Sequence, residues 1–167
     1  MKKLVLSTFS AFLLLFVLAG AVFAAPTAEK EHVRIKGTLH AVEVAVFGPN
    51  GSVISNATGS GKGSVLGNFT YSFTVAISPT STGILYYHFV AANGDSLFSS
   101  GPGVGTDVGP NMGHVVETHT ITGGTGRFAG ASGNITIERL VTWTCECSGG
   151  IGTSYGTFTG DIVVVDR

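Results

Sequence analysis

The chain has 167 residues, of which 44% are hydrophobic and only 11% are charged, whereas about 25% of the residues of a typical globular domain are charged. Its nine Lys and Arg residues against ten Asp and Glu residues leave no basic excess, which excludes a nucleic-acid-binding protein. The apolar composition also excludes a disordered chain, and the length fits one domain that can fold without a metal or disulfide.

The amino-terminal segment has the layout of a secretory signal peptide. Lys2 and Lys3 precede an apolar run that ends in small residues just before Pro26. We therefore predict a signal peptide over residues 1–24, followed by a flexible leader over residues 25–31. An uncleaved membrane anchor is the alternative, because the run is almost long enough to span a bilayer.

Cleavage of this segment would give a soluble exported protein. Without Lys2 and Lys3, seven basic and ten acidic residues remain, so the net charge would be −3. Such a protein has no charge-based reason to bind an anionic membrane surface. We expect it to be secreted or periplasmic, without membrane contact.

Residues 32–167 have the pattern of a single domain made of β-strands. The clearest pattern covers residues 69–77, where Phe69, Tyr71 and Phe73 alternate with small, mostly hydroxylic residues. Successive side chains of a strand point to opposite faces, so this alternation predicts a strand with one buried face. Weaker versions of the pattern predict strands over residues 32–47, 83–92, 96–99, 113–122, 133–144 and 154–165.

Segments rich in Gly and Asn separate these predicted strands. The Asn–Gly pairs at residues 50–51 and 93–94 supply the positive φ angles that tight hairpin turns need. Residues 99–113 contain five Gly and two Pro, so we predict a loop there rather than a strand. The chain has no amphipathic helical window of useful length.

Seven or eight antiparallel strands in one small domain must hide their edges. The common solutions are a closed barrel and a two-layer sandwich. Abundant Gly within the strand patterns suits a strongly bent, closed sheet. The sequence therefore predicts an all-β fold, an antiparallel eight-stranded β-barrel, with a β-sandwich as the alternative.

A Gly-rich segment, Ile121–Gly133, carries a family resemblance. Its sequence ITGGTGRFAGASG resembles the GGTGRFAGA.G signature of the allene oxide cyclase barrel and dirigent-like superfamily. Many small exported bacterial proteins carry a similar signature. Residues 63–70 and 92–95 resemble two further landmarks of those exported proteins.

The resemblance implies an eight-stranded barrel with an apolar central cavity. Plant members of the superfamily act on oily small molecules: one group cyclises an epoxide made from a fatty acid, and another steers the coupling of aromatic radicals. The resemblance assigns no catalytic residue to this chain, because the signature covers a turn and the start of a strand rather than an active site.

The signature also has a structural interpretation. We expect Gly123, Gly124 and Gly126 to permit a tight turn with close backbone approach, and Gly124 to need a positive φ. Phe128 can plug the end of the barrel, and Arg127 can pair with an acidic residue. A phosphate-binding loop is excluded, since it would need a following helix and a strand follows here.

Glu117 and His119 are the candidate catalytic residues. They share one face of a predicted strand, where a carboxylate can polarise an imidazole as a general base. If this face of the strand lines a cavity, the two residues form a candidate catalytic site. If it faces water, they are ordinary surface residues. Glu43, Glu138 and Asp161 lie on other predicted strands and could join such a site.

Tyr71, Phe73 and His88 are candidates for the wall of a ligand cavity. His88 lies between Tyr87 and Phe89, and this apolar setting indicates a buried, hydrogen-bonded histidine, with a ligand-binding role as the alternative. The His and Cys spacings match no metal site, and we predict neither a metal nor a cofactor.

Cys145 and Cys147 are the only thiols. Residues two apart in a strand lie near the limit of disulfide reach, so a bridge between them requires a kink, which the following Ser–Gly–Gly permits. Free or intermolecular thiols and metal capture are the alternatives to a strained Cys145–Cys147 bridge.

Three functions fit this sequence. The first is an exported barrel that binds a small hydrophobic or aromatic molecule in its interior. The second is a structural or interaction module of the cell envelope, with a barrel filled by Phe and Tyr. The third is a cyclase- or isomerase-like enzyme in which Glu117 and His119 face the cavity near an opening. No feature of the sequence fixes an oligomeric state.

Overall fold

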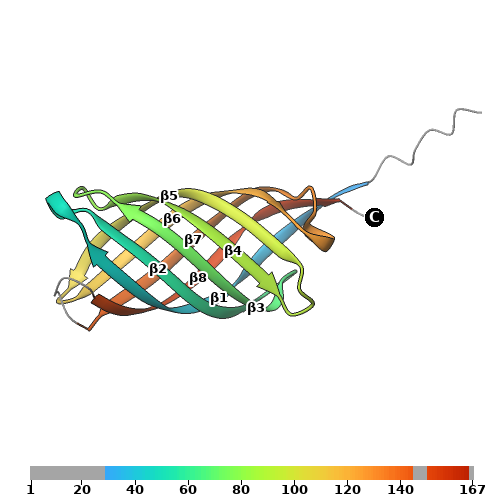
Figure 1. Cartoon of the computed structure of the whole chain (residues 1–167). Helices are drawn as coiled ribbons and strands as arrows, with labels where there is room; N and C mark the ends of the chain where they lie inside the picture. Colours follow the sequence, from blue (N-terminus) through green and yellow to red (C-terminus); the bar gives the residue numbers. More distant parts are fainter. Residues whose placement is uncertain (1–28, 145–149, 166–167) are drawn as a thin grey trace, which may run out of the picture.

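The β-strands follow one another around a closed antiparallel barrel of eight strands, as predicted (Figure 1). The computed structural model describes residues 29–144 and 150–165. The strands are β1 Lys30–Phe47, β2 Val53–Gly63, β3 Gly67–Ile77, β4 Thr82–Ala91, β5 Ser96–Gly109, β6 Met112–Gly124, β7 Ser132–Trp143 and β8 Gly150–Val165.

Pairing of the first strand with the last closes the barrel. β1 pairs with β8 from Lys30, opposite Val165, to Ala45, opposite Gly150. Strand β1 therefore begins at Lys30, two residues before the predicted start of the domain and inside the predicted leader. Closure leaves no long unpaired edge, which an open sheet of these strands would expose.

Two 3₁₀ turns lie at opposite ends of the barrel. η1 (Pro49–Gly51) joins β1 to β2, and η2 (Gly126–Phe128) joins β6 to β7 (cyan and orange in Figure 1). Within the part of the chain that the structure describes, no helix has the length and apolar character that a membrane crossing requires.

The sequence pattern misses β2 and mistakes most of β5 for a loop. β2 carries few large apolar residues, and β5 runs on to Gly109 through most of the segment predicted as a loop. Only Pro110 and Asn111 turn the chain there, and Asn111 has a φ of 57°. The prediction is wrong because glycines in these strands face the barrel interior as spacers rather than bending the chain into a loop.

The glycines of β2 make room for aromatic rings. A Cβ added to Gly59 would lie 2.7 Å from the Tyr71 ring, and one added to Gly63 would lie 2.7 Å from the Phe158 ring. The rings pack together in turn: Tyr71 stacks on Tyr87 with ring centres 5.8 Å apart. The half of the barrel near η2 is thus filled by aromatic side chains from several strands.

The signature segment closes this filled end. Phe128 is fully buried in the core, as predicted, and Arg127 lies 3.6 Å from the Asp95 carboxylate. Gly123 and Gly126 have positive φ angles of 137° and 56°. Between the pairs Phe98–Gly123 and Ser99–Ile121 the register shifts, so Gly123 lies at a bulge.

Gly124 is required for a different reason from the one predicted. Its φ is not in the positive range. A Cβ at this position would instead overlap the Ser96 carbonyl oxygen and lie 2.5 Å from the Phe128 Cβ. The constraint is therefore space between the β6 backbone and the Phe128 plug, not backbone conformation.

We expect Gly124→Ala to lower the free energy of unfolding by about 1–3 kcal/mol, because the new methyl group overpacks the plug. Urea unfolding followed by circular dichroism measures the change. Gly113→Ala is the control, since the nearest atom to a Cβ there is 4.0 Å away, and it should change stability by less than about 0.5 kcal/mol. Equal stabilities of the two variants would contradict the steric explanation.

Candidate functional site

The half of the barrel near η1 contains a pocket instead of a packed core. Its volume is about 160 Å³, and its walls carry apolar side chains from β3, β4, β6 and β7. The pocket is lined by Glu43, Val75, Ile77, Ser81, Gly83, Leu85, Gly103, Gly105, Thr106, Asp107, Gly113, Val115, Arg139, Val141 and Trp143.

A wider mouth continues from this pocket towards the turns at the same end. It has a volume of about 390 Å³ and shares Ile77, Ser81, Asp107, Gly113 and Trp143 with the pocket. Trp143 is the single tryptophan of the chain. An apolar ligand entering through the mouth would therefore pass Trp143 before it reached the pocket floor.

Buried charged side chains form the floor. Arg139 donates a hydrogen bond through Nη1 to Glu43 Oε1 and another through Nε to Glu117 Oε1, the latter 2.6 Å long. The three side chains are between 0% and 4% exposed. The guanidinium also lies over the Phe73 ring, 4.5 Å from its centre. Arg139 is thus held by two carboxylates and an aromatic face.

Small residues of β8 allow β1 and β7 to meet across the interior. Glu43 pairs with Gly152 of β8, and Arg139 pairs with Gly156. A Cβ at Gly156 would lie 2.7 Å from the Arg139 Cβ. Because β8 lacks large inward side chains at these positions, Arg139 can reach over it to Glu43.

His119 extends the cluster beneath the floor. Its Nε2 lies 3.3 Å from Glu117 Oε2, although the two atoms do not meet hydrogen-bond geometry. Its Nδ1 interacts with Ser99 Oγ at 3.1 Å, and its ring packs edge-on against Tyr87, with centres 5.0 Å apart. Glu117 and His119 therefore point inward side by side, both fully buried.

The environment fixes the charge states of these groups. Burial alone would raise the pKa of Glu117, but the adjacent His119 and the Arg139 guanidinium outweigh it and lower the pKa. Burial would lower the pKa of Arg139, but Tyr87, Glu117 and Glu43 raise it. Burial also raises the pKa of the Tyr71 and Tyr87 hydroxyls, so both stay protonated near neutral pH.

No protein-family model and no curated protein matches the chain. The solved structure of the pterocarpan synthase dirigent protein GePTS1 is similar to it, with a TM-score of 0.56 and 14% sequence identity over 86% of this chain and 90% of that one. The fold is a dirigent-like β-barrel. At this identity the likeness concerns the fold alone.

The dirigent-like barrel distributes the residues singled out in the sequence between its two faces. Tyr71 and Phe73 point inward but belong to the packed aromatic stack and do not line the pocket. Glu43 joins Glu117 through Arg139. Glu138 and Asp161 lie on the exposed outer face. Cys145 and Cys147 lie outside the described residues.

The burial predicted for His88 is wrong. His88 is exposed on the outer wall, where its Nε2 interacts with Ser96 Oγ at 2.9 Å and its ring lies 4.8 Å from that of Phe98. Tyr87 and Phe89 take the inward positions of β4. Because β4 is apolar on both faces, its composition gave no sign of which face is buried.

Arg139 and Trp143 are the site residues that the sequence analysis missed. Both follow the alternation of Ile135 and Ile137, which is the inward face of β7. A charged residue on the apolar face of a strand is the signal that could have identified Arg139, because an unpaired buried charge is too costly to keep.

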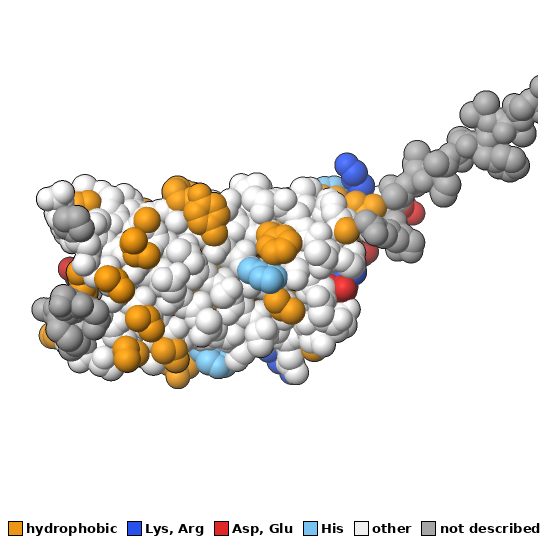
Figure 2. All heavy atoms as spheres, in the orientation of Figure 1, with side chains coloured by type: hydrophobic (Ala, Val, Ile, Leu, Met, Phe, Trp, Pro, Cys, Tyr) orange, Lys and Arg blue, Asp and Glu red, His pale blue; other side chains and the backbone are white. Residues whose placement is uncertain are grey.

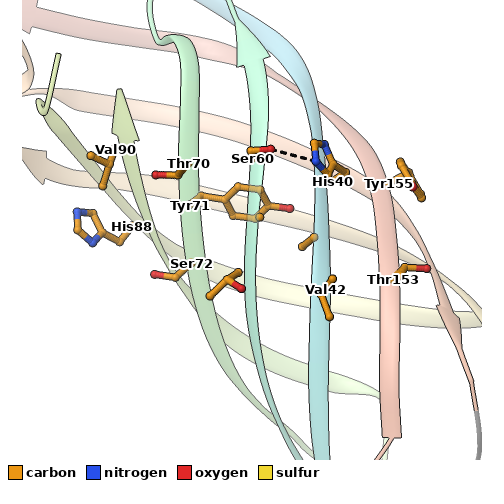
Figure 3. Close-up of a pocket in the computed structure, with 13 residues that line it drawn as sticks. His40, Val42, Ser60, Thr70, Tyr71, Ser72, His88, Val90, Thr153 and Tyr155 are labelled. Carbon is orange, nitrogen blue, oxygen red and sulfur yellow. Dashed lines mark hydrogen bonds between the residues drawn. The ribbon is translucent and has the colours of Figure 1, made fainter. Parts of the chain in front are cut away.

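The outer wall of the dirigent-like barrel carries a shallow groove over β8, β1, β2, β3 and β4 (Figure 3). Figure 3 shows His40 bonded to Ser60, with a distance of 3.0 Å between Nε2 and Oγ. The described residues that line the groove include no carboxylate, Lys or Arg. Figure 2 shows that the visible outer surface has scattered apolar side chains and few charged ones. The convergent charged groups are inside the barrel, so the interior pocket is the better candidate.

We expect Glu117→Gln to reduce the loss of unfolding free energy that the protein shows as the pH falls. The folded-state pKa of Glu117 is lowered, so this carboxylate stabilises the fold above its unfolded value of about 4.3, and that contribution is lost as the pH falls below it. Urea unfolding between about pH 6 and pH 3 should show a smaller loss of stability for the variant than for the wild type.

Glu138→Gln is the matched control for this measurement, because Glu138 lies on the same barrel wall but is exposed. It should keep the wild-type slope. Glu117→Gln should also lower the free energy of unfolding at pH 7 by about 1–3 kcal/mol, since Arg139 loses a charged partner. An unchanged acid slope would contradict the charge assignment of Glu117.

Proposed function

We propose that this protein is an exported barrel that binds a small apolar or aromatic molecule in its η1 end. The observation that carries the proposal is the interior pocket, whose apolar walls end on the hydrogen-bonded pair of Glu43 and Arg139. Binding sites for small molecules typically combine apolar walls with a few convergent polar groups.

The pocket volume sets the size of the ligand. An apolar cavity of about 150 Å³ is known to hold benzene, and this pocket measures about 160 Å³. The mouth adds further space that Trp143 borders. A single ring with a short chain fits this combination, whereas a larger molecule would extend into the mouth.

The arrangement of the interior favours binding over the two alternatives. A structural module with a filled barrel would have packed side chains along its whole length, but here a pocket of about 160 Å³ remains near η1. A cyclase- or isomerase-like role for Glu117 and His119 would need both near an opening. They are fully buried and do not line the pocket.

The amino-terminal layout supports export, with a secreted or periplasmic location. The positive start, the apolar run and the small-residue exit before Pro26 are the features that a signal peptidase substrate has. A soluble barrel outside the cytoplasm suits a role in holding an apolar molecule away from water.

A pocket-filling variant tests the proposal. Val115 is half-buried at the pocket wall, so Val115→Phe should fill the space that a ligand ring needs and weaken binding by about tenfold or more. The probe is 2-phenylethanol, a neutral single-ring molecule. Binding is followed through the fluorescence of Trp143, the only tryptophan.

Val116→Phe is the control, because Val116 is the next residue on β6 and is exposed on the outer wall. It should bind the probe like the wild type. A probe that binds equally well to both variants would overturn the proposal.

A further inference from the structure

The charges around the pocket do not balance. Arg139 is shared by Glu43 and Glu117, so one guanidinium faces two carboxylates. Among the described residues, the hydrogen bond of Glu43 uses Oε1, and none uses its Oε2. Glu43 is 2% exposed and lines the pocket. Glu43 therefore brings to the pocket floor a carboxylate oxygen that accepts no hydrogen bond from the described residues.

The mouth adds negative charge to the same space. Asp107 lines both the pocket and the mouth. Arg139 is the only Lys or Arg among the described residues that line either of them, and it is already bonded to two carboxylates. At the buried floor, where the dielectric constant is low, the charge of Glu43 attracts a cation and repels an anion, and the exposed Asp107 adds a weaker effect of the same sign at the mouth.

The remaining titratable groups do not remove this excess at Glu43. His119 contacts Glu117 beneath the floor and does not line the pocket, so it does not face Glu43. The hydroxyls of Tyr71 and Tyr87 keep their protons because burial raises their pKa, so they add no charge of either sign. Glu43 is left as the charged acceptor that a ligand can reach.

We propose that the pocket binds a small amine, whose ammonium group pairs with Glu43 while its apolar part lies between the walls. This inference rests on the proposed function and names its ligand class. Val75, Leu85 and Val141 would surround the apolar part, and Trp143 would border it at the mouth. Carboxylates such as fatty acids are excluded from this class, because they would meet Glu43 and Asp107.

Three probes of nearly equal size test the ligand class: 2-phenylethylamine, 2-phenylethanol and phenylacetate. At pH 7 they carry a positive charge, no charge and a negative charge. Titration of Trp143 fluorescence should give an amine affinity about tenfold or more above that of the alcohol, since the amine gains a charge-assisted hydrogen bond. Phenylacetate should bind more weakly than either.

Glu43→Gln should remove the advantage of the amine, so that the amine and alcohol affinities of this variant differ by less than about twofold. Glu138→Gln, an exposed site outside the pocket, should keep the full advantage. If circular dichroism shows that Glu43→Gln does not fold, Asp107→Asn replaces it. Asp107 is exposed, so this variant should fold, and it should lower the ratio of amine to alcohol affinity several-fold.

The outcomes separate the two proposals. Binding of the alcohol as tight as that of the amine, or tighter binding of phenylacetate, would overturn the amine assignment and leave the proposed function standing. An amine advantage that survives in folded Glu43→Gln, or in Asp107→Asn where that variant replaces it, would also overturn it. If none of the three probes changes Trp143 fluorescence, both proposals fail.

Discussion

The interior depends on the shared guanidinium of Arg139. It joins β7 to carboxylates on β1 and β6, so three strands of the barrel meet at one buried cation. Either carboxylate alone would be a costly buried charge, and the cation alone would be too. The cluster also marks a boundary: aromatic rings fill the barrel on the η2 side, and the pocket opens on the η1 side. Fold stability and the candidate site therefore rest on the same ion pairs.

The inward glycines have different surroundings on the two sides of this boundary. On the packed side, the inward glycines of β2 lie directly under aromatic rings, and a Cβ at Gly59 would lie 2.7 Å from Tyr71. On the open side, the nearest atoms to a Cβ at Gly105 and Gly113 are 3.9 Å and 4.0 Å away. Other glycines on the open side are covered, because a Cβ at Gly83 would lie 2.7 Å from Val75 and one at Gly103 would lie 2.6 Å from Leu85. The empty space of the pocket therefore lies beside Gly105 and Gly113, which have no side chain close to them.

Alternation of large and small residues was enough to predict most of the strands and the closed antiparallel barrel. It failed for β2 and β5, because several of their inward positions are glycines that make room for atoms of neighbouring strands, such as the Tyr71 ring at Gly59 and the Leu85 side chain at Gly103. It placed Glu117 and His119 on one face but gave no partner, since Arg139 meets them only through the β6–β7 register. His88 was misjudged because neighbours along a strand, Tyr87 and Phe89, point to the opposite face. Patterns within one strand thus predict the fold, whereas the site depends on contacts between strands.

The dirigent-like fold does not determine which molecule the interior accepts, because the lining residues do. A barrel of this kind with a neutral floor would select ligands by size and apolar area alone. Here Glu43 and Arg139 form the floor of the pocket. Their electrostatic interactions are strong because both side chains are buried away from water. Glu43 carries a negative charge that Arg139, shared with Glu117, cannot fully balance. Under the proposed function, the charge that the pocket favours in a ligand therefore depends on how many carboxylates share the single buried guanidinium of Arg139.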